Sequence, residues 1–324
     1  MDWLVLGGTG VVVAIALQLW TTLRPAKPLA LSGLHVFVTG GSQGLGFAIA
    51  KHYAEAGARV SIVARSAAAL DTARKQLEAV GTHQVFAAPC DVTDFAAVLG
   101  AVDAANAFHG RVTDHVVCNA GISEPGFLLD QSNAVFHRLM EVNYFGTLHA
   151  VKAALPAMVA RGSGGKFIFI NSGCGVVAFA GFAQYAASKF AIRGLADALR
   201  NELRLFNMTV HCFYPGSIDT PMFAGEQAQK PDITKAIEGS TELVSPEAAT
   251  ASLMRGVANG TYAITNDVGI WAGRVMGNGI CPRATMAEAL LAPILVIAQV
   301  CFGWYMDGLV LSEKRNQKEK EKHA

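Results

Sequence analysis

The sequence predicts an α/β fold with a doubly wound parallel β-sheet, an N-terminal transmembrane helix and a C-terminal membrane-associated hydrophobic segment. Short apolar runs alternate with helix-length segments between about residues 29 and 265, which is typical of strand–helix–strand units. These runs are continuously apolar, as expected for parallel strands that are buried on both faces. Hydrophobic residues make up 52% of the 324 residues, and two uncharged stretches near the chain ends account for the excess.

The order of these segments divides the chain into four expected regions. They are a membrane anchor over 1–28, the α/β domain over 29–265, a hydrophobic membrane-associated or dimerising segment over 266–311, and a basic cytosolic tail over 312–324. The expected strands are 35–39, 59–64, 84–88, 115–118, 166–170 and 209–214, all rich in Val, Ile or Phe. The expected helices include 44–56, 67–80, 133–160 and 183–206.

The first apolar stretch, Trp3–Leu23, has 21 residues without a charge. As a helix it would be about 31 Å long, which matches a hydrocarbon core of about 30 Å. A cleaved signal peptide would place a basic residue before the stretch, but Asp2 precedes it and Arg24 and Lys27 follow. This asymmetry favours an uncleaved anchor with the rest of the chain on the cytoplasmic side.

The second stretch, Ala289–Met306, has 18 uncharged residues and contains Pro293. The basic residues that follow it disfavour a single crossing, so we expect a re-entrant or interfacial element, with a dimer interface as an open alternative. The final residues, Lys320–Ala324, resemble the K-x-K-x-x retrieval signal of endoplasmic-reticulum membrane proteins. We therefore expect an endoplasmic-reticulum membrane protein whose main domain faces the cytosol.

Charge and cysteine content exclude several classes of protein. A formal net charge of +1 gives no attraction to nucleic acid, and 16% charged residues with 52% hydrophobic residues exclude a disordered chain. The six cysteines form no C-x-x-C pair and have no histidine at metal-ligand spacing. We interpret them as small buried side chains, and we expect no metal site.

A glycine-rich loop follows the first expected strand directly. It has the spacing G-x-x-x-G-x-G, with Gly40, Gly44 and Gly46 at the glycine positions. Glycines allow the backbone to approach a pyrophosphate closely, and the N-terminus of the next helix presents free N–H groups. Glycines can also simply mark a turn, but a loop between the first strand and the first helix favours a dinucleotide site.

The end of the second expected strand favours NADPH over NADH. Enzymes that use NAD place an acidic residue there to hold the ribose 2′-hydroxyl, whereas this chain has Arg65 and Ser66. A guanidinium suits a 2′-phosphate by its charge and its fork of donors. Asp91 and Val92, after the third strand, and the turn Asn119-Ala120-Gly121, after the fourth, are further candidates for contact with the cofactor.

Three residues in the second half of the domain carry the chemistry. Ser172 ends the fifth strand region, Tyr185 follows 13 positions later, and Lys189 lies one helical turn beyond Tyr185 on the same face. Tyrosine has an ordinary pKa of about 10. For a tyrosine to exchange protons at neutral pH, its charged form must be stabilised by about 4 kcal/mol. An ammonium about 4 Å away can supply this. We expect Lys189 to lower the pKa of Tyr185.

These motifs together resemble the short-chain dehydrogenase/reductase family over about residues 30–265. The resemblance implies a Rossmann fold, a nicotinamide cofactor and assembly into dimers or tetramers. It also implies that Tyr185 donates the proton, Lys189 lowers its pKa and binds ribose, Ser172 holds the carbonyl and Asn143 supports a water relay. The implied cofactor-binding residues are Gly40, Ser42, Gln43, Gly44, Leu45, Gly46, Arg65, Ser66, Asp91, Val92, Asn119, Ala120, Gly121, Tyr185, Lys189, Pro215, Gly216, Ile218 and Thr220.

A narrower resemblance is to the membrane-anchored reductases of sphingolipid synthesis. It rests on the segments 27–31, 188–196 and 218–223 and on the hydrophobic C-terminal region. It implies a long-chain sphingoid ketone as substrate, contact with membrane lipid and an NADPH-dependent reduction. Ala69 stands where the relatives carry a lysine, which removes one contact to the 2′-phosphate. The alternatives are an anchored reductase of steroid, retinoid or 3-ketoacyl substrates, and a membrane scaffold that binds NADPH without catalysis.

Overall fold

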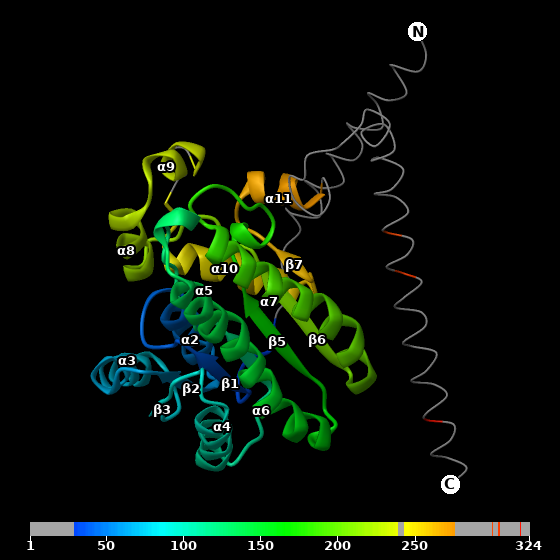
Figure 1. Ribbon diagram of the computed structural model, residues 1–324. Coiled ribbons are helices and arrows are strands. Elements are labelled where there is room, and N and C mark those ends of the chain that lie inside the picture. The colour runs from blue at the N-terminus through cyan, green and yellow to red at the C-terminus, as the bar shows by residue number, and fades with distance from the viewer. Residues whose placement is uncertain (1–28, 239–242, 276–299, 301–303, 305–317, 319–324) are drawn as a thin grey trace.

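The computed structural model describes residues 29–238 and 243–275, together with residues 300, 304 and 318. Seven parallel strands form one sheet in the order β3-β2-β1-β4-β5-β6-β7 (Figure 1). The strands are β1 His35–Thr39, β2 Arg59–Ala64, β3 Phe86–Pro89, β4 His115–Cys118, β5 Gly165–Ile170, β6 Met208–Phe213 and β7 Ala263–Ile264. The predicted doubly wound parallel sheet is therefore confirmed.

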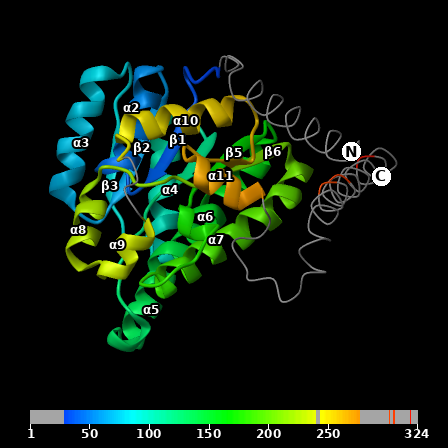
Figure 2. The ribbon, with the colours of Figure 1, turned by 90° about the horizontal axis from the view of Figure 1, so that it is seen from above.

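Helices cover both faces of the sheet, as Figure 2 shows for α2 and α10 on one side and α6 and α7 on the other. The first half of the domain contains α2 Gly44–Glu55, α3 Ala67–Val80, α4 Phe95–His109, α5 Asn133–Leu139 and α6 Gly146–Arg161. The second half contains α7 Ala183–Glu202, α8 Pro221–Gln229, α9 Asp232–Glu238, α10 Pro246–Ala258 and α11 Val268–Val275.

Two apolar cores hold these layers together, one on each face of the sheet. The first joins Val98 of α4 and Ala150 of α6 to Ile192 of α7 beneath the sheet residue Phe167. The second joins Tyr53 of α2 and Leu77 of α3 to α10. The continuous apolar runs in the strands supply both cores, because successive side chains of a strand point to opposite faces.

Several elements of the structure differ from the prediction. The third strand begins at Phe86 rather than residue 84, because Val85 N donates to Glu78 Oε1 instead of joining the sheet. The helix predicted over 133–160 is interrupted by a π-helical turn, Met140–Phe145. The two-residue strand β7 was not predicted, since it is too short to show a hydrophobic pattern.

The expected membrane segments cannot be compared with the fold. Residues 3–23, and all of 289–306 except Val300 and Trp304, lie outside the described residues. Among the residues that are described, no helix combines the length and apolar character that a membrane crossing requires. The four regions predicted along the chain stay a prediction, although α11 continues the described structure past residue 265.

Cysteines in the described part of the chain are buried, as predicted for Cys90, Cys118, Cys174 and Cys212. Burial raises the pKa of Cys118 and of Cys174 to about 12. Both therefore remain neutral thiols at physiological pH, although Cys174 lies two residues from Ser172.

Two buried histidines make the stability of the domain sensitive to acid. Burial lowers the pKa of His35 and of His115 from 6.5 to about 3. His115 Nδ1 is 2.8 Å from the hydroxyl of Tyr53, and His35 Nε2 is 2.8 Å from Ser61 Oγ. The unfolded chain takes up these protons below pH 6.5 while the folded chain does not, so stability is present above that pH and is lost as pH falls.

We expect the free energy of unfolding to fall by about 2 kcal/mol for each histidine between pH 7 and pH 5. Urea unfolding of the full chain in detergent, followed by circular dichroism at both pH values, measures this loss. The variant His115→Gln cannot be protonated at that position and should lose correspondingly less stability. An equal loss in the variant and the unmodified chain would contradict the contribution of His115.

Candidate active site

The carboxyl ends of the central strands form the framework of the site. Strand order reverses between β1 and β4, and ligands of doubly wound sheets bind outside the strand ends at such a point. Asn119, directly after β4, donates from Nδ2 to Thr39 O at 3.0 Å and to Gly40 O at 3.1 Å. Thr39 Oγ1 in turn accepts from Ala120 N at 3.1 Å. The loops after β1 and β4 are thus held together as one rigid edge.

The glycine loop leads into an open helix N-terminus. Gly40 has φ of +66°, a conformation that L side chains rarely adopt. A Cβ on Gly46 would lie 2.3 Å from Gly40 O, so a side chain there would displace the loop. Gln43 occupies the N-cap of α2 without a side-chain hydrogen bond, and the first turn contains no acidic residue. Backbone N–H groups and the positive end of the helix dipole therefore face the cavity, as a phosphate requires.

Arg65 and Ser66 lie at the end of β2, on the rim of the same cavity. Arg65 is exposed, while Ser66 caps α3 by accepting from Ala69 N at 3.3 Å. The pKa of Asp91 is lowered, chiefly by hydrogen bonds from Thr93 and further by the charge of Arg65. A guanidinium, a hydroxyl and a helix N-terminus are therefore grouped where a ribose phosphate could be bound.

Ser172, Tyr185 and Lys189 come together below the loop that follows β5. Ser172 Oγ accepts from Cys174 N at 3.2 Å, which fixes the orientation of the serine. Tyr185 and Lys189 are 6% and 4% exposed and project from one face of α7. Lys189 Nζ donates to Ile170 O at 3.1 Å and lies 5.5 Å from the centre of the Tyr185 ring. The spacing in the sequence therefore does bring the three side chains into one place.

The predicted lowering of the Tyr185 pKa is wrong for the protein by itself. Burial raises the pKa of Tyr185 well above its ordinary value, the charge of Glu226 acts in the same direction, and a hydrogen bond with Ser172 opposes it. Burial also lowers the pKa of the Lys189 ammonium to about 8. The desolvation of both groups outweighs their attraction, because Lys189 is held by Ile170 O rather than by the phenol oxygen. Tyr185 is therefore a protonated phenol at neutral pH.

Asn143 lies in the π-helical turn and is fully buried. Its Oδ1 accepts from Ile122 N at 2.8 Å, and its Nδ2 donates to Ile122 O at 3.0 Å and to Ser188 Oγ at 2.9 Å. It thus connects the loop after β4 to α7. The predicted water relay is not tested by these contacts, and Asn143 does not line the cavity.

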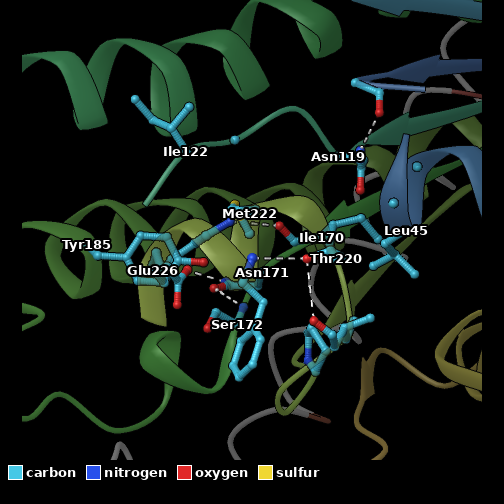
Figure 3. Close-up of a pocket in the computed structure, with 18 of the residues that line it drawn as sticks. Leu45, Asn119, Ile122, Ile170, Asn171, Ser172, Tyr185, Thr220, Met222 and Glu226 are labelled. Carbon is cyan, nitrogen blue, oxygen red and sulfur yellow. Dashed lines mark hydrogen bonds between the residues drawn. The ribbon is translucent and has the colours of Figure 1, made fainter. Parts of the chain in front are cut away.

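One cavity of about 650 Å³ runs along this edge of the sheet. Every predicted cofactor-binding residue lines it, and so do Ser172, Tyr185 and Lys189. Figure 3 shows Leu45, Asn119 and Thr220 around one part of the cavity and Ser172 with Tyr185 at another. A long cleft with a phosphate-binding loop and a proton donor fits a dinucleotide and a second, smaller reactant.

The wall opposite the glycine loop contains residues that the sequence did not indicate individually. They come from the loop after β4, from the segment 176–182 before α7, and from α8, α9 and α11. The additional lining residues include Ile122, Val177, Phe179, Phe182, Met222, Phe223, Glu226, Ile237, Glu238 and Ile270. Most are apolar, and no local motif marks them, because they meet only when α8, α9 and α11 fold over the cavity.

The short chain dehydrogenase family matches residues 34–231, which is more than half of the chain. The chain belongs to the short-chain dehydrogenase family. It is accordingly an oxidoreductase with a nicotinamide cofactor, and the glycine loop, the uncapped start of α2 and the long cleft fit such a cofactor.

This short-chain dehydrogenase is similar to curated proteins over nearly its whole length. The 3-ketodihydrosphingosine reductase of Dictyostelium discoideum is 32% identical over 311 residues, covering 90% of this chain and 92% of that protein. The enzyme of the same name from Bos taurus is 35% identical and covers 78% and 76%. A Burkholderia phymatum short-chain dehydrogenase crystallised with NAD shares the fold, with a TM-score of 0.69 at 22% identity over 80% of this chain and all of that chain.

Proposed function

We propose that the chain reduces the C3 ketone of 3-ketodihydrosphingosine to dihydrosphingosine, with NADPH as the reductant. The observation that carries the proposal is the group Ser172, Tyr185 and Lys189 in one cavity of a chain that resembles 3-ketodihydrosphingosine reductases over most of its length. A nucleotide-binding scaffold would need none of these three side chains.

The geometry supports a reduction in which Tyr185 is the proton donor. The reduced nicotinamide, when bound, supplies a hydride to the carbonyl carbon. Tyr185 gives its phenolic proton to the carbonyl oxygen, so that the ketone becomes a secondary alcohol. Ser172 Oγ donates a hydrogen bond to the same oxygen as negative charge develops there. Burial keeps Tyr185 protonated, which is the form that a reduction needs at its start.

The Lys189 ammonium stabilises the tyrosinate that remains after proton transfer. Its Nζ is held over one face of the phenol ring by Ile170 O. A tyrosinate and an ammonium carry opposite charges, and these attract strongly in a desolvated site. A proton from solvent then restores the phenol before the next turnover.

The remaining features suit a lipid substrate. The apolar wall built by Phe179, Phe182, Met222 and Ile237 can contact a hydrocarbon chain. Residues 3–23 and 289–306 support a place at a membrane, and the tail 320–324 supports retention at the endoplasmic reticulum with the catalytic domain in the cytosol. A long-chain ketone partitions into lipid, so an anchored enzyme meets its substrate there.

The preference for NADPH is supported by Arg65 at the end of β2, where enzymes that use NAD carry an acidic residue. The Ser66 hydroxyl, which accepts from Ala69 N, and the N-terminus of α3 lie at the same place. A 2′-phosphate would therefore be bound by a guanidinium and by backbone N–H groups, whereas NADH would lack the group that these donors recognise.

Turnover of three ketones tests the proposal. The full-length enzyme in detergent micelles is given 3-ketodihydrosphingosine, a steroid ketone or a 3-ketoacyl thioester, and NADPH absorbance is followed. We expect kcat/KM to be greatest for 3-ketodihydrosphingosine. A higher value for either of the other ketones would assign the enzyme to that substrate class, and no oxidation with any ketone would favour a non-catalytic scaffold.

A further inference from the structure

A buried charged group lies against the apolar wall of the cavity. It consists of Glu226 on α8, Lys230 directly after α8, and Glu238 at the end of α9. The Lys230 side chain is fully buried, and its Nζ lies 2.6 Å from Glu238 Oε2 but 3.7 Å from Glu226 Oε2. The same ammonium lies over the rings of Phe182 and Phe223 at 5.3 Å and 5.2 Å from their centres. Lys230 is therefore bound most tightly by Glu238.

The charges in this group do not balance. Two carboxylates share one ammonium, and Glu226 is the carboxylate with the longer contact. Its side chain is only 10% exposed, so solvent screens it little. Burial of a carboxylate is costly unless a cation or several donors neutralise it. Burial raises the pKa of the Glu226 carboxyl, and the Ser123 hydroxyl and Lys230 oppose this effect only in part, so a further cation would stabilise the carboxylate.

Glu226 faces the reacting groups rather than the outer surface. It lines the cavity together with Ser172 and Tyr185, and Figure 3 shows these three side chains at one end of it. Its charge adds to the effect of burial in raising the pKa of Tyr185, and it partly offsets the lowering that burial causes in the pKa of Lys189. The shared lining of the cavity therefore puts the carboxylate near the place where a carbonyl would be reduced.

We propose that Glu226 binds the ammonium group of an α-amino ketone and so positions the neighbouring carbonyl between Ser172 and Tyr185. The inference rests on the proposed function, because 3-ketodihydrosphingosine carries its amino group on C2, next to the C3 ketone. An ammonium held by Glu226 would put the neighbouring carbonyl in the part of the cavity that Ser172 and Tyr185 also line. The hydrocarbon chain, on the other side of the ketone, then follows the apolar wall.

This arrangement distinguishes amino ketones from other long-chain ketones. A steroid ketone or a 3-ketoacyl thioester has no cation next to the carbonyl, so its binding would leave the Glu226 carboxylate desolvated without a partner. A site whose buried charge is left without a partner discriminates strongly against a substrate that lacks the matching charge. Glu226 is therefore a residue that determines substrate specificity.

The test compares 3-ketodihydrosphingosine with the analogue that has hydrogen in place of the C2 amino group. The full-length enzyme, Glu226→Gln, and the matched control Glu202→Gln, which changes an exposed carboxylate at the end of α7, are assayed with both ketones and NADPH. Lys230 keeps its close contact with Glu238 in Glu226→Gln, so the buried ammonium remains paired.

We expect Glu226→Gln to lower kcat/KM for the amino ketone by about 10- to 100-fold, as for loss of a hydrogen bond between charged groups, and to leave the analogue almost unchanged. Glu202→Gln should change neither value, and the Kd of NADPH should be the same in all three proteins. Glu226→Asp retains the charge and is expected to keep part of the preference for the amino ketone.

An equal loss with both ketones, or no loss with either, overturns the role of Glu226 while leaving the proposed function in place. Failure of the unmodified enzyme to reduce either ketone overturns the proposed function itself, and the inference with it. The contact is also not based on charge if Glu226→Asp prefers the amino ketone no more strongly than Glu226→Gln does.

Discussion

Tyr185→Phe is expected to lower ketone reduction by about 10³-fold or more, the range that loss of a general acid produces. Phenylalanine preserves the ring, which packs 5.7 Å from Phe182 between ring centres and lies beside Lys189. Only the hydroxyl that supplies the proton is removed. The Kd of NADPH should remain nearly unchanged, because the phosphate-binding loop and Lys189 are untouched.

Steady-state assays with 3-ketodihydrosphingosine, together with equilibrium titration of NADPH, measure the two quantities separately. Tyr53→Phe is the matched control, since it removes a buried hydroxyl that contacts His115, away from the cavity. It should keep its activity. Loss of NADPH binding in Tyr185→Phe, or turnover close to that of the unmodified enzyme, would contradict the role assigned to the phenol.

Arg65→Asp is expected to lower kcat/KM for NADPH by about 100-fold, which corresponds to the loss of a charge-assisted contact and the gain of a repulsive charge. The aspartate would repel the 2′-phosphate. It would also offer an acceptor to the ribose 2′-hydroxyl of NADH, in the manner of enzymes that use NAD. Activity with NADH should therefore be retained or increased.

The measurement is kcat/KM for NADPH and for NADH at saturating ketone. Arg255→Asp provides the control, because it reverses an exposed charge on α10 that does not line the cavity. It should leave the ratio of the two values unchanged. Equal losses with NADPH and NADH in Arg65→Asp would show that the guanidinium does not select the cofactor.

Much of the fold could be predicted from hydrophobic patterns, because each pattern involves only residues that are close together in the chain. The apolar runs at 35–39, 59–64 and 115–118 coincide with β1, β2 and β4, because strands in the middle of a parallel sheet must be apolar on both faces. The two edge strands of the sheet, β3 and β7, were harder to predict. β3 is shifted because Glu78 binds Val85 N, and β7 has only two residues. Neither effect is visible in the local pattern.

The same distinction holds for the candidate site. The spacing of the glycines and the single helical turn between Tyr185 and Lys189 are local features of the sequence. Their positions in the fold could therefore be predicted from the short chain segments that contain them. Glu226 and Lys230 are also four residues apart, but no local spacing connects either of them with Phe182 or Tyr185. They meet because α7 and α8 pack around one cavity, and this depends on contacts between residues far apart in the chain.

Local spacing therefore specified which groups could carry out the chemistry, and tertiary packing decided their charge states and their surroundings. Tyr185 illustrates the division. Its distance from Lys189 along the helix suggested a lowered pKa, but the pKa is raised because the protein removes water from the phenol and places Glu226 nearby. Desolvation depends on everything that surrounds a group in space, so it could be known only once the chain was folded.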